Sequence, residues 1–469
     1  MSRTYTVLLP SVRNSDPHLY SDSHALLTMR RLLFQGLLAY DGRSMRGVLA
    51  EGWEVEDEGR RWVFHLRRGA RFPNGKECDS GDVLYSLKRA ASRDVAGELF
   101  TVTYHEYIGG ADFEAPDPST VVLRNPAPIA DLGELLPDLA VLPAGWRSYA
   151  DGTGTGDYRL EELTEGRAVL RRRAGAGSRQ DGPDTLELRA KSDASARAAE
   201  LRQGRADLAL DPPREELDRA GAGGEIEAVG WDSHLAVIFF IDCRTPPLAD
   251  PRVRRALNLA VDKERLIDEV LQGRAKPLNG AFSDRHFGWD PRVAPYPYDP
   301  AEARSLLQEA GLVDGAPLAI NAPTSLPEEA PALAAFLQDS YRAVGISAQV
   351  VLHEDRVEYA RKVAAKELSG LSCFDSSPLS TYKVLHEKLD SSFAGTWWQG
   401  YHHEGINGLL ARAAATANSA SRRQLYWHIY RILHDEAPWV YLYQPTRYWL
   451  RRRDSAQSIG IDALGFLAL

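Results

Sequence analysis

The chain has 469 residues, 44% of them hydrophobic and 9% aromatic, which is the composition of a globular protein with a sizeable core. A chain of this length exceeds what one hydrophobic core organises, so two or three lobes are expected. Its formal net charge of −9 argues against nucleic acid or an anionic membrane surface as the main partner, because both attract basic patches.

The N-terminal sequence MSRTYTVLLP lacks the long apolar core and the cleavage site of a signal peptide, and residues 4–9 are predicted to form a first buried strand. The sequence has no run of 18 apolar residues that could span a membrane. Its three cysteines, Cys78, Cys243 and Cys373, are widely separated and show no zinc-binding spacing. They are predicted to be isolated thiols, and no metal or other cofactor is expected.

A turn and a helix are predicted to follow the first strand. The sequence DPHLY at 16–20 indicates the turn, and the helix is expected from about Ser23 to Leu38, with Asp41-Gly42 as its stop. Further along, the segment WVFHL at 62–66 alternates apolar and more polar residues, which predicts a strand with one apolar face. A turn precedes that strand, an Asn-Gly turn follows it, and an amphipathic helix is expected to open at Ser80.

The middle of the chain continues this mixture of strands and helices. The glycine-rich run GTGTGD at 152–157 is predicted to be a crossover between lobes rather than a phosphate cradle, because neither a helix start nor a lysine follows it. Residues 235–241 form a nearly unbroken apolar run, which is typical of a strand buried on both faces. Prolines surround the start of the next helix, with Asp250 as its expected N-cap.

The segment from Leu49 to Leu87, with its order of strand, acidic turn, strand, Asn-Gly turn and helix, closely resembles the signature region of bacterial extracytoplasmic solute-binding proteins of family 5. Further similarity lies at 246–263, 299–307 and 422–440, so the resemblance covers nearly the whole chain in order. It implies an α/β, periplasmic-binding-protein-like fold (class II, cluster C) with two lobes and an extra small domain inserted in lobe 1. The expected divisions are lobe 1 at 1–38, 155–233 and 443–469, the inserted domain at 39–154, lobe 2 at 234–442, and a hinge near 231–236 and 441–448.

The resemblance implies a solute-binding protein of an ABC importer, which closes around a small polar ligand such as a short peptide or an amino-acid derivative. Its partners would be that ligand and, if the protein is exported, an ABC permease, with a monomer as the family default. Members of the family are normally exported to the periplasm or the cell surface. The missing leader leaves open a cytoplasmic protein that senses a metabolite or acts on it as an enzyme.

For the enzyme alternative, Asp375, His402 and Tyr401 are the candidate acids and bases. The sequence contains no Gly-x-Ser-x-Gly elbow, P-loop or His-Glu-x-x-His motif, so no catalytic residue is assigned.

The densest aromatic cluster, WWQGYHH at 397–403, contains the candidate ligand contacts Trp397, Trp398, Tyr401 and His402. Aromatic rings with polar tips suit a pocket that stacks on a ligand, and ordinary core packing is the alternative. If the segment is a strand, the two tryptophans face opposite ways, so one is expected in the core and one toward the cleft. His402 could face a ligand or lie in a solvated loop, since adjacent histidines lack the spacing of helical metal sites.

Asp375 is the candidate anchor for the ammonium group of a ligand. Peptide binders of the resembling family carry an aspartate in the loop before the aromatic segment; here that loop is 373–378, and Asp375 stands one residue away from the family position. Tyr20 and His24 follow the first turn, where resembling proteins place a proline element at the mouth of the cleft, and are further candidate contacts. The arginine that nickel-chelate binders use has no clear match at 136–143, which argues against metallophore transport.

Overall fold

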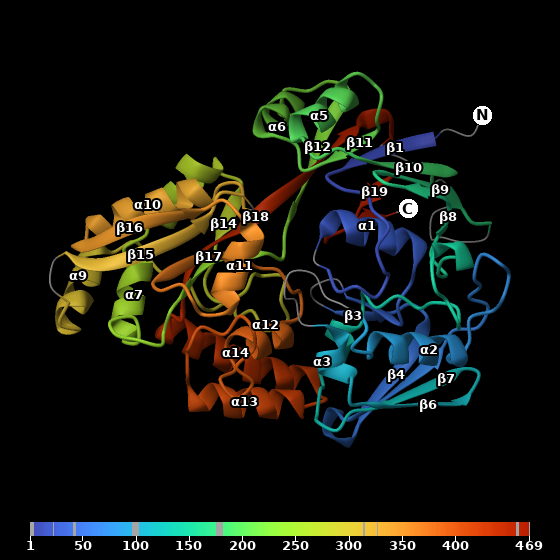
Figure 1. Cartoon of the computed structure of the whole chain (residues 1–469), viewed down its shortest axis with the longest axis horizontal. Helices are drawn as coiled ribbons and strands as arrows, with labels where there is room; N and C mark the ends of the chain where they lie inside the picture. Colours follow the sequence, from blue (N-terminus) through green and yellow to red (C-terminus); the bar gives the residue numbers. More distant parts are fainter. Residues whose placement is uncertain are drawn as a thin grey trace. The chain divides into compact units, whose positions relative to one another are not determined.

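The structure is a computed structural model that describes residues 4–21, 23–40, 44–95, 103–174, 182–312, 315–325, 327–455 and 459–468. The chain forms two compact units, Met1–Trp231 with Arg447–Leu469, and Asp232–Thr446 (Figure 1). It therefore passes between the units twice, once after Trp231 and once after Thr446. The run 152–157 has both of its ends in the first unit, so the prediction that it crosses between lobes is wrong for these two units. The finer division of lobe 1 stays a prediction.

The first unit contains a mixed sheet, a smaller sheet and short helices. Its strands are β1 (Thr4–Leu9), β2 (Leu38–Tyr40), β3 (Met45–Gly47), β4 (Ala50–Glu56), β5 (Arg61–Leu66), β6 (Asp112–Asp117), β7 (Thr120–Arg124), β8 (Tyr158–Thr164), β9 (Arg167–Arg172), β10 (Thr185–Ala190), β11 (Leu208–Leu210), β12 (Ile226–Asp232), β19 (Gly460–Ile461) and β20 (Leu467–Ala468). Its helices are α1 (His24–Leu33), α2 (Ser80–Ala90), α3 (Tyr104–Ile108), α4 (Leu132–Leu135), α5 (Ala194–Arg202) and α6 (Arg214–Gly221).

The first strand is central to this unit, as its apolar sequence predicts. It pairs in parallel with β10 on one side and β11 on the other, and all of its residues except Thr4 are buried. The helix that follows is shorter than predicted: α1 ends at Leu33, and Leu38 begins β2 instead. The proposed stop at Asp41-Gly42 lies outside the described residues.

The signature region forms the four-stranded sheet β4-β5-β7-β6 with α2 beside it, which confirms the predicted strand and helix. Trp62 and Phe64 are fully buried on β5, and the turn at 57–59 joins β4 to β5. The helix begins at Ser80 as predicted, and Asp79 before it is the N-cap and forms a capping box with Asp82.

The second unit is built on a sheet in the order β16-β15-β17-β13-β18. Its strands are β13 (Ala236–Ile241), β14 (Ala275–Pro277), β15 (Ala316–Pro323), β16 (Ile346–His353), β17 (Leu371–Ser376) and the start of β18 (Trp439–Arg452). Its helices are α7 (Pro251–Leu259), α8 (Lys263–Leu266), α9 (Pro300–Glu309), α10 (Ala330–Arg342), α11 (Arg356–Ala364), α12 (Thr381–Lys388), α13 (Glu404–Ala414) and α14 (Ser419–Glu436). Every residue of β13 is buried, and Asp250 caps α7, both as predicted.

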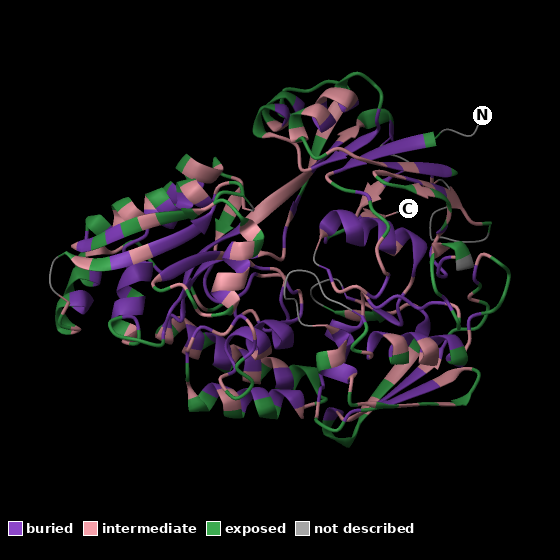
Figure 2. Cartoon of the chain, in the orientation of Figure 1, coloured by how far each residue is buried: buried purple, intermediate pink, exposed green. Residues whose placement is uncertain are grey.

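One strand, β18, belongs to both units. Its first residues pair with β13 in the second unit, and Trp449–Arg451 pair with β11 in the first. Along β18, residues 445–448 are of intermediate burial and lie between the buried residues 439–444 and 449–450 (Figure 2). The change of unit falls inside this less buried stretch.

Within the described ranges, no helix combines the length and the apolar character that crossing a membrane requires.

Candidate functional site

The carboxyl end of β17 gathers polar side chains. Asp375 on β17 and Tyr443 on β18 both pair with Val237 of β13, which lies between them. Directly paired residues of neighbouring strands project to the same face, so Asp375 and Tyr443 share one face of the sheet. Asp375 is thus the second-to-last residue of a strand, not part of a loop as its position before Pro378 had suggested.

Glu329, immediately before α10, joins this group. The hydroxyl of Tyr443 donates a hydrogen bond of 2.6 Å to Oε1 of Glu329. Burial raises the pKa of Tyr443, and the charges of Glu329 and Asp375 raise it further. The pKa of the Cys373 thiol is raised in the same way, first by burial and then by Asp375 and Glu329. Two carboxylates therefore act on the same buried groups, and the negative potential that they create suits a cationic group such as an ammonium ion.

The loop that follows Asp375 is held firmly at several points. Nε2 of His286 lies 2.9 Å from the carbonyl oxygen of Pro378, and Nζ of Lys388 donates a hydrogen bond of 2.8 Å to Oγ of Ser376. Ser380 caps α12 through the backbone N–H of Lys383. Burial lowers the pKa of His286 to about 3, so its ring is neutral at physiological pH.

Trp397 lies on the opposite face of the sheet from Asp375. Its ring packs against Phe374, with 4.7 Å between the ring centroids, and neighbouring residues of a strand project to opposite faces. The prediction that the two tryptophans alternate along a strand is wrong, because 396–397 form a turn and residue 398 belongs to no helix or strand. Trp398 is half-buried, and its indole N–H donates a hydrogen bond of 2.6 Å to the carbonyl oxygen of Tyr401.

Tyr401 lies near the other end of β13. Gln399 lies two residues before Tyr401. Its backbone carbonyl oxygen accepts a hydrogen bond from the backbone N–H of Cys243, which follows β13. Cys243 is six residues beyond Val237, about 20 Å along an extended chain. Tyr401 is buried beneath the guanidinium of Arg254, so the structure does not bring it together with Asp375.

His402 is exposed, and its Nδ1 lies 2.7 Å from Oγ of Ser391. The neighbouring His403 caps α13 by accepting a hydrogen bond from the backbone N–H of Ile406. Across the described part of the chain, no group of three or more potential ligands could hold a metal ion.

In the first unit, Tyr20 lies in the loop at 16–20, which two arginines bind. Its ring meets that of Tyr104 edge to face at 5.6 Å. The guanidinium of Arg30, which is 5% exposed, donates hydrogen bonds of 2.6 and 2.8 Å to the carbonyl oxygens of Leu19 and Asp16. Arg89 on α2 forms an ion pair with the carboxylate of Asp16. These contacts with Asp16 and Leu19 therefore fix the backbone of the loop and, with it, the position of Tyr20.

His24 opens α1 and is buried within the core of the first unit. Its ring stacks on Phe466 at 4.2 Å and on Trp231 at 5.2 Å. His24 is buried and Tyr20 is half-buried, so of the two candidates in this unit Tyr20 keeps more of its surface accessible.

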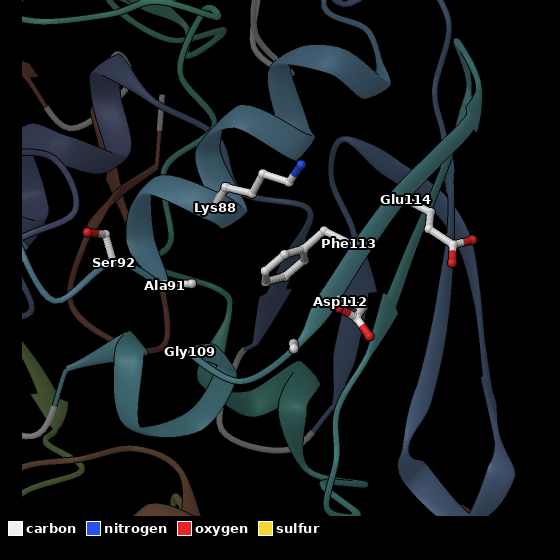
Figure 3. Close-up of a pocket in the computed structure, with 8 residues that line it drawn as sticks. Lys88, Ala91, Ser92, Gly109, Asp112, Phe113 and Glu114 are labelled. Carbon is white, nitrogen blue, oxygen red and sulfur yellow. The ribbon is translucent and has the colours of Figure 1, made fainter.

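A pocket of about 500 Å³ lies beside α2 in the first unit (Figure 3). The ring of Phe113 on β6 turns toward α2, and the carboxylates of Asp112 and Glu114 turn away from it, as the alternation of a strand requires. Lys88 contributes the charged side chain on the helix side. None of the residues predicted to bind a ligand lines this pocket.

Two α/β units linked by crossing strands, with carboxylates at the carboxyl end of a central strand, define a two-lobed binding protein. The model of the bacterial extracellular solute-binding proteins, family 5 Middle, matches residues 44–398. The chain belongs to this family and is a solute-binding protein with the periplasmic-binding-protein-like fold that the sequence predicts.

Individual relatives share this fold. The chain is 27% identical over 427 residues to the glutathione-binding protein GsiB of Salmonella choleraesuis, covering 87% of this chain and 82% of that protein. It superposes on HbpA2 from Haemophilus parasuis with a TM-score of 0.84 at 19% identity, covering 99% and 98% of the two chains. It also superposes on the periplasmic binding protein DppA from Helicobacter pylori in complex with the peptide STSA, with a TM-score of 0.76 at 20% identity, covering 100% and 98%.

Proposed function

We propose that this protein captures a small ligand with a free ammonium group, of the short-peptide or amino-acid-derivative class, and presents it outside the cytoplasm to an ABC permease. The observation that carries the proposal is the pair of carboxylates, Asp375 and Glu329, around the buried hydroxyl of Tyr443. An ammonium ion donates up to three hydrogen bonds and is stabilised by two nearby negative charges.

The names of the relatives support this class of ligand. GsiB is called a glutathione-binding protein, and DppA is described with a bound tetrapeptide. Such ligands carry an ammonium group at one end. From the first unit, Tyr20 is proposed as a contact because its loop is fixed before any ligand arrives, which reduces the entropy lost on binding.

Of the other sequence candidates, Trp398 and His402 retain exposed surface and stay proposed contacts. His24, Trp397 and Tyr401 are buried in packing contacts, and the proposal does not depend on them.

Calorimetric titration of the purified protein with glutathione and with unmodified tripeptides tests the proposal. A free amino terminus should bind, and the N-acetylated form of the same peptide should bind at least about tenfold more weakly, since a charge-assisted hydrogen bond contributes about 1.5–3 kcal/mol. Asp375→Asn and Glu329→Gln should each weaken binding by a similar factor. Glu328→Gln removes the same charge from the exposed neighbouring residue and should leave affinity unchanged. Equal affinity for free and acetylated peptides would contradict the proposal.

A further inference from the structure

A four-residue segment of the second unit, Ser283 to His286, touches three other parts of that unit. Oγ of Ser283 lies 3.0 Å from the carbonyl oxygen of His234, in the segment that enters the unit. Oδ1 of Asp284 accepts a hydrogen bond of 2.8 Å from Nε2 of Gln444, near the point where β18 leaves the unit. His286 contacts the loop after β17. We name Ser283–His286 the strap.

Ser283 and His286 make their contacts while buried, and Asp284 is half-buried. Ser283 is fully buried, and His286 and Gln444 are each 4% exposed. Buried polar contacts of this kind are costly to break, because each group would lose its partner without gaining water. The strap therefore restrains three segments at the same time: the segment at His234 where the chain enters the unit, the segment at Gln444 where it leaves, and the loop after β17.

The hydrogen positions follow from the partners of His286. Both ring nitrogens lie near carbonyl oxygens, which can only accept, but Nε2 is 2.9 Å from that of Pro378 and Nδ1 is 3.3 Å from that of Ser283, so we place the hydrogen on Nε2. In the neutral ring, Nδ1 is then an acceptor, 3.1 Å from the hydroxyl of Ser283. That hydroxyl has one hydrogen and two acceptors within reach, Nδ1 and the carbonyl oxygen of His234. The ring and the hydroxyl thus form a continuous chain of contacts from Pro378 to His234.

We propose that His286 is a positioning residue for ligand binding, which holds the loop after Asp375 in place and couples it through Ser283 to the chain passage at His234. This inference rests on the proposed function, because it takes Asp375 as a ligand contact. His286 acts through the loop and does not touch the ligand. When the strap is intact, the loop and the passage are ordered together, and a ligand that orders the loop also orders the passage.

Two substitutions of His286 separate the hydrogen bond from the bulk of the ring. His286→Gln keeps an N–H donor at nearly the position of Nε2, whereas His286→Leu fills the space without any donor. The measurements are the dissociation constant for an unmodified tripeptide and hydrogen exchange of the peptides that contain residues 233–236 and 376–380.

His286→Leu should weaken peptide binding by roughly tenfold, the cost of re-ordering about one backbone residue. It should also speed hydrogen exchange at 233–236 and at 376–380. The affinity of His286→Gln for the tripeptide should stay within about threefold of that of the unaltered protein. Leu307→Ala is the control for a general loss of stability, since Leu307 is buried in α9 of the same unit, and it should leave affinity unchanged.

The outcomes distinguish the two proposals. If the unaltered protein binds no peptide, the proposed function fails, and the exchange of 233–236 in His286→Leu still tests the coupling. If the unaltered protein binds peptide and His286→Leu binds it equally well, the positioning role of His286 is wrong. Faster exchange at 376–380 without any change at 233–236 would overturn the coupling alone.

Discussion

The hydroxyl of Tyr443 on β18 donates a hydrogen bond of 2.6 Å to the carboxylate of Glu329, at the start of α10. Tyr443 is fully buried, and it shares its face of the sheet with Asp375. One phenol therefore sets the orientation of a carboxylate that lies 114 residues away in sequence.

Tyr443→Phe should lower the free energy of unfolding by about 1.5–3 kcal/mol, because Glu329 is left without this partner. Peptide affinity should fall several-fold, since the carboxylate is no longer oriented. Urea unfolding and calorimetry measure the two effects. Tyr341→Phe is the matched control, because the buried hydroxyl of Tyr341 has no hydrogen-bond partner in the described part of the chain and its removal should cost no stability.

Arg30→Lys should destabilise the first unit by about 1–3 kcal/mol, since an ammonium group cannot reproduce the two hydrogen bonds to Leu19 and Asp16 at once. The adjacent Arg31→Lys is the control. Arg31 pairs with Asp138 while 30% exposed, and its guanidinium lies 3.8 Å from the centroid of the Phe466 ring; each contact contributes at most about 1 kcal/mol. Thermal unfolding and limited proteolysis at 16–20 compare the variants. Equal losses would mean that Arg30 does not hold the loop.

Lys263 should make stability depend on pH. Burial lowers the pKa of its ammonium group to about 7 in the folded protein, with one hydrogen bond of 3.3 Å to the carbonyl oxygen of Tyr296. Between that value and the ordinary pKa of 10.5 the unfolded chain binds a proton that the folded protein lacks, so stability rises with pH across this window.

Lys263→Met removes this contribution. The difference in unfolding free energy between the unaltered protein and Lys263→Met should grow by about 1.4 kcal/mol per pH unit in favour of the unaltered protein between pH 7 and 9. Urea unfolding at several pH values measures it, and a difference independent of pH would show that Lys263 is not buried as an uncharged amine.

Gly156→Ala should strongly destabilise the first unit. A Cβ atom there would lie 2.5 Å from the carbonyl oxygen of Leu32 and from the backbone of Leu33, so α1 or the loop must move. We expect a loss of about 1–3 kcal/mol, the usual cost of overpacking. Gly408→Ala on α13 is the contrasting variant, since a Cβ there meets nothing within 4 Å, and it should stabilise by up to about 1 kcal/mol. Thermal unfolding compares the two.

The sequence predicted correctly those elements in which the local residue pattern and the position in the tertiary structure favour the same secondary structure. The apolar run at 235–241 is a fully buried strand, and the alternation at 62–66 is a strand with Trp62 and Phe64 in the core. The end of α1 was missed because the apolar residues after Leu33 suit a helix or a strand equally well, and pairing with β3 decided for the strand.

The site was harder to predict, because it depends on which face of a sheet each residue occupies. Asp375 and Trp397 are close in sequence, yet the packing of Trp397 on Phe374 puts them on opposite faces. Glu329 was missed altogether, since nothing in its local sequence connects it to β17. Its only signal is a pair of glutamates before an alanine-rich helix, a pattern equally typical of an ordinary helix start.

The shared strand β18 has a consequence for the order of synthesis. The second unit is one uninterrupted stretch, Asp232–Thr446, whereas the first unit also needs Arg447–Leu469. During synthesis on a ribosome, the second unit can therefore be complete before Trp449–Arg451, the residues that pair with β11, have been made. The N-terminal unit is made first and finished last, so a nascent chain truncated before Arg447 should contain a foldable C-terminal piece behind an incomplete N-terminal one.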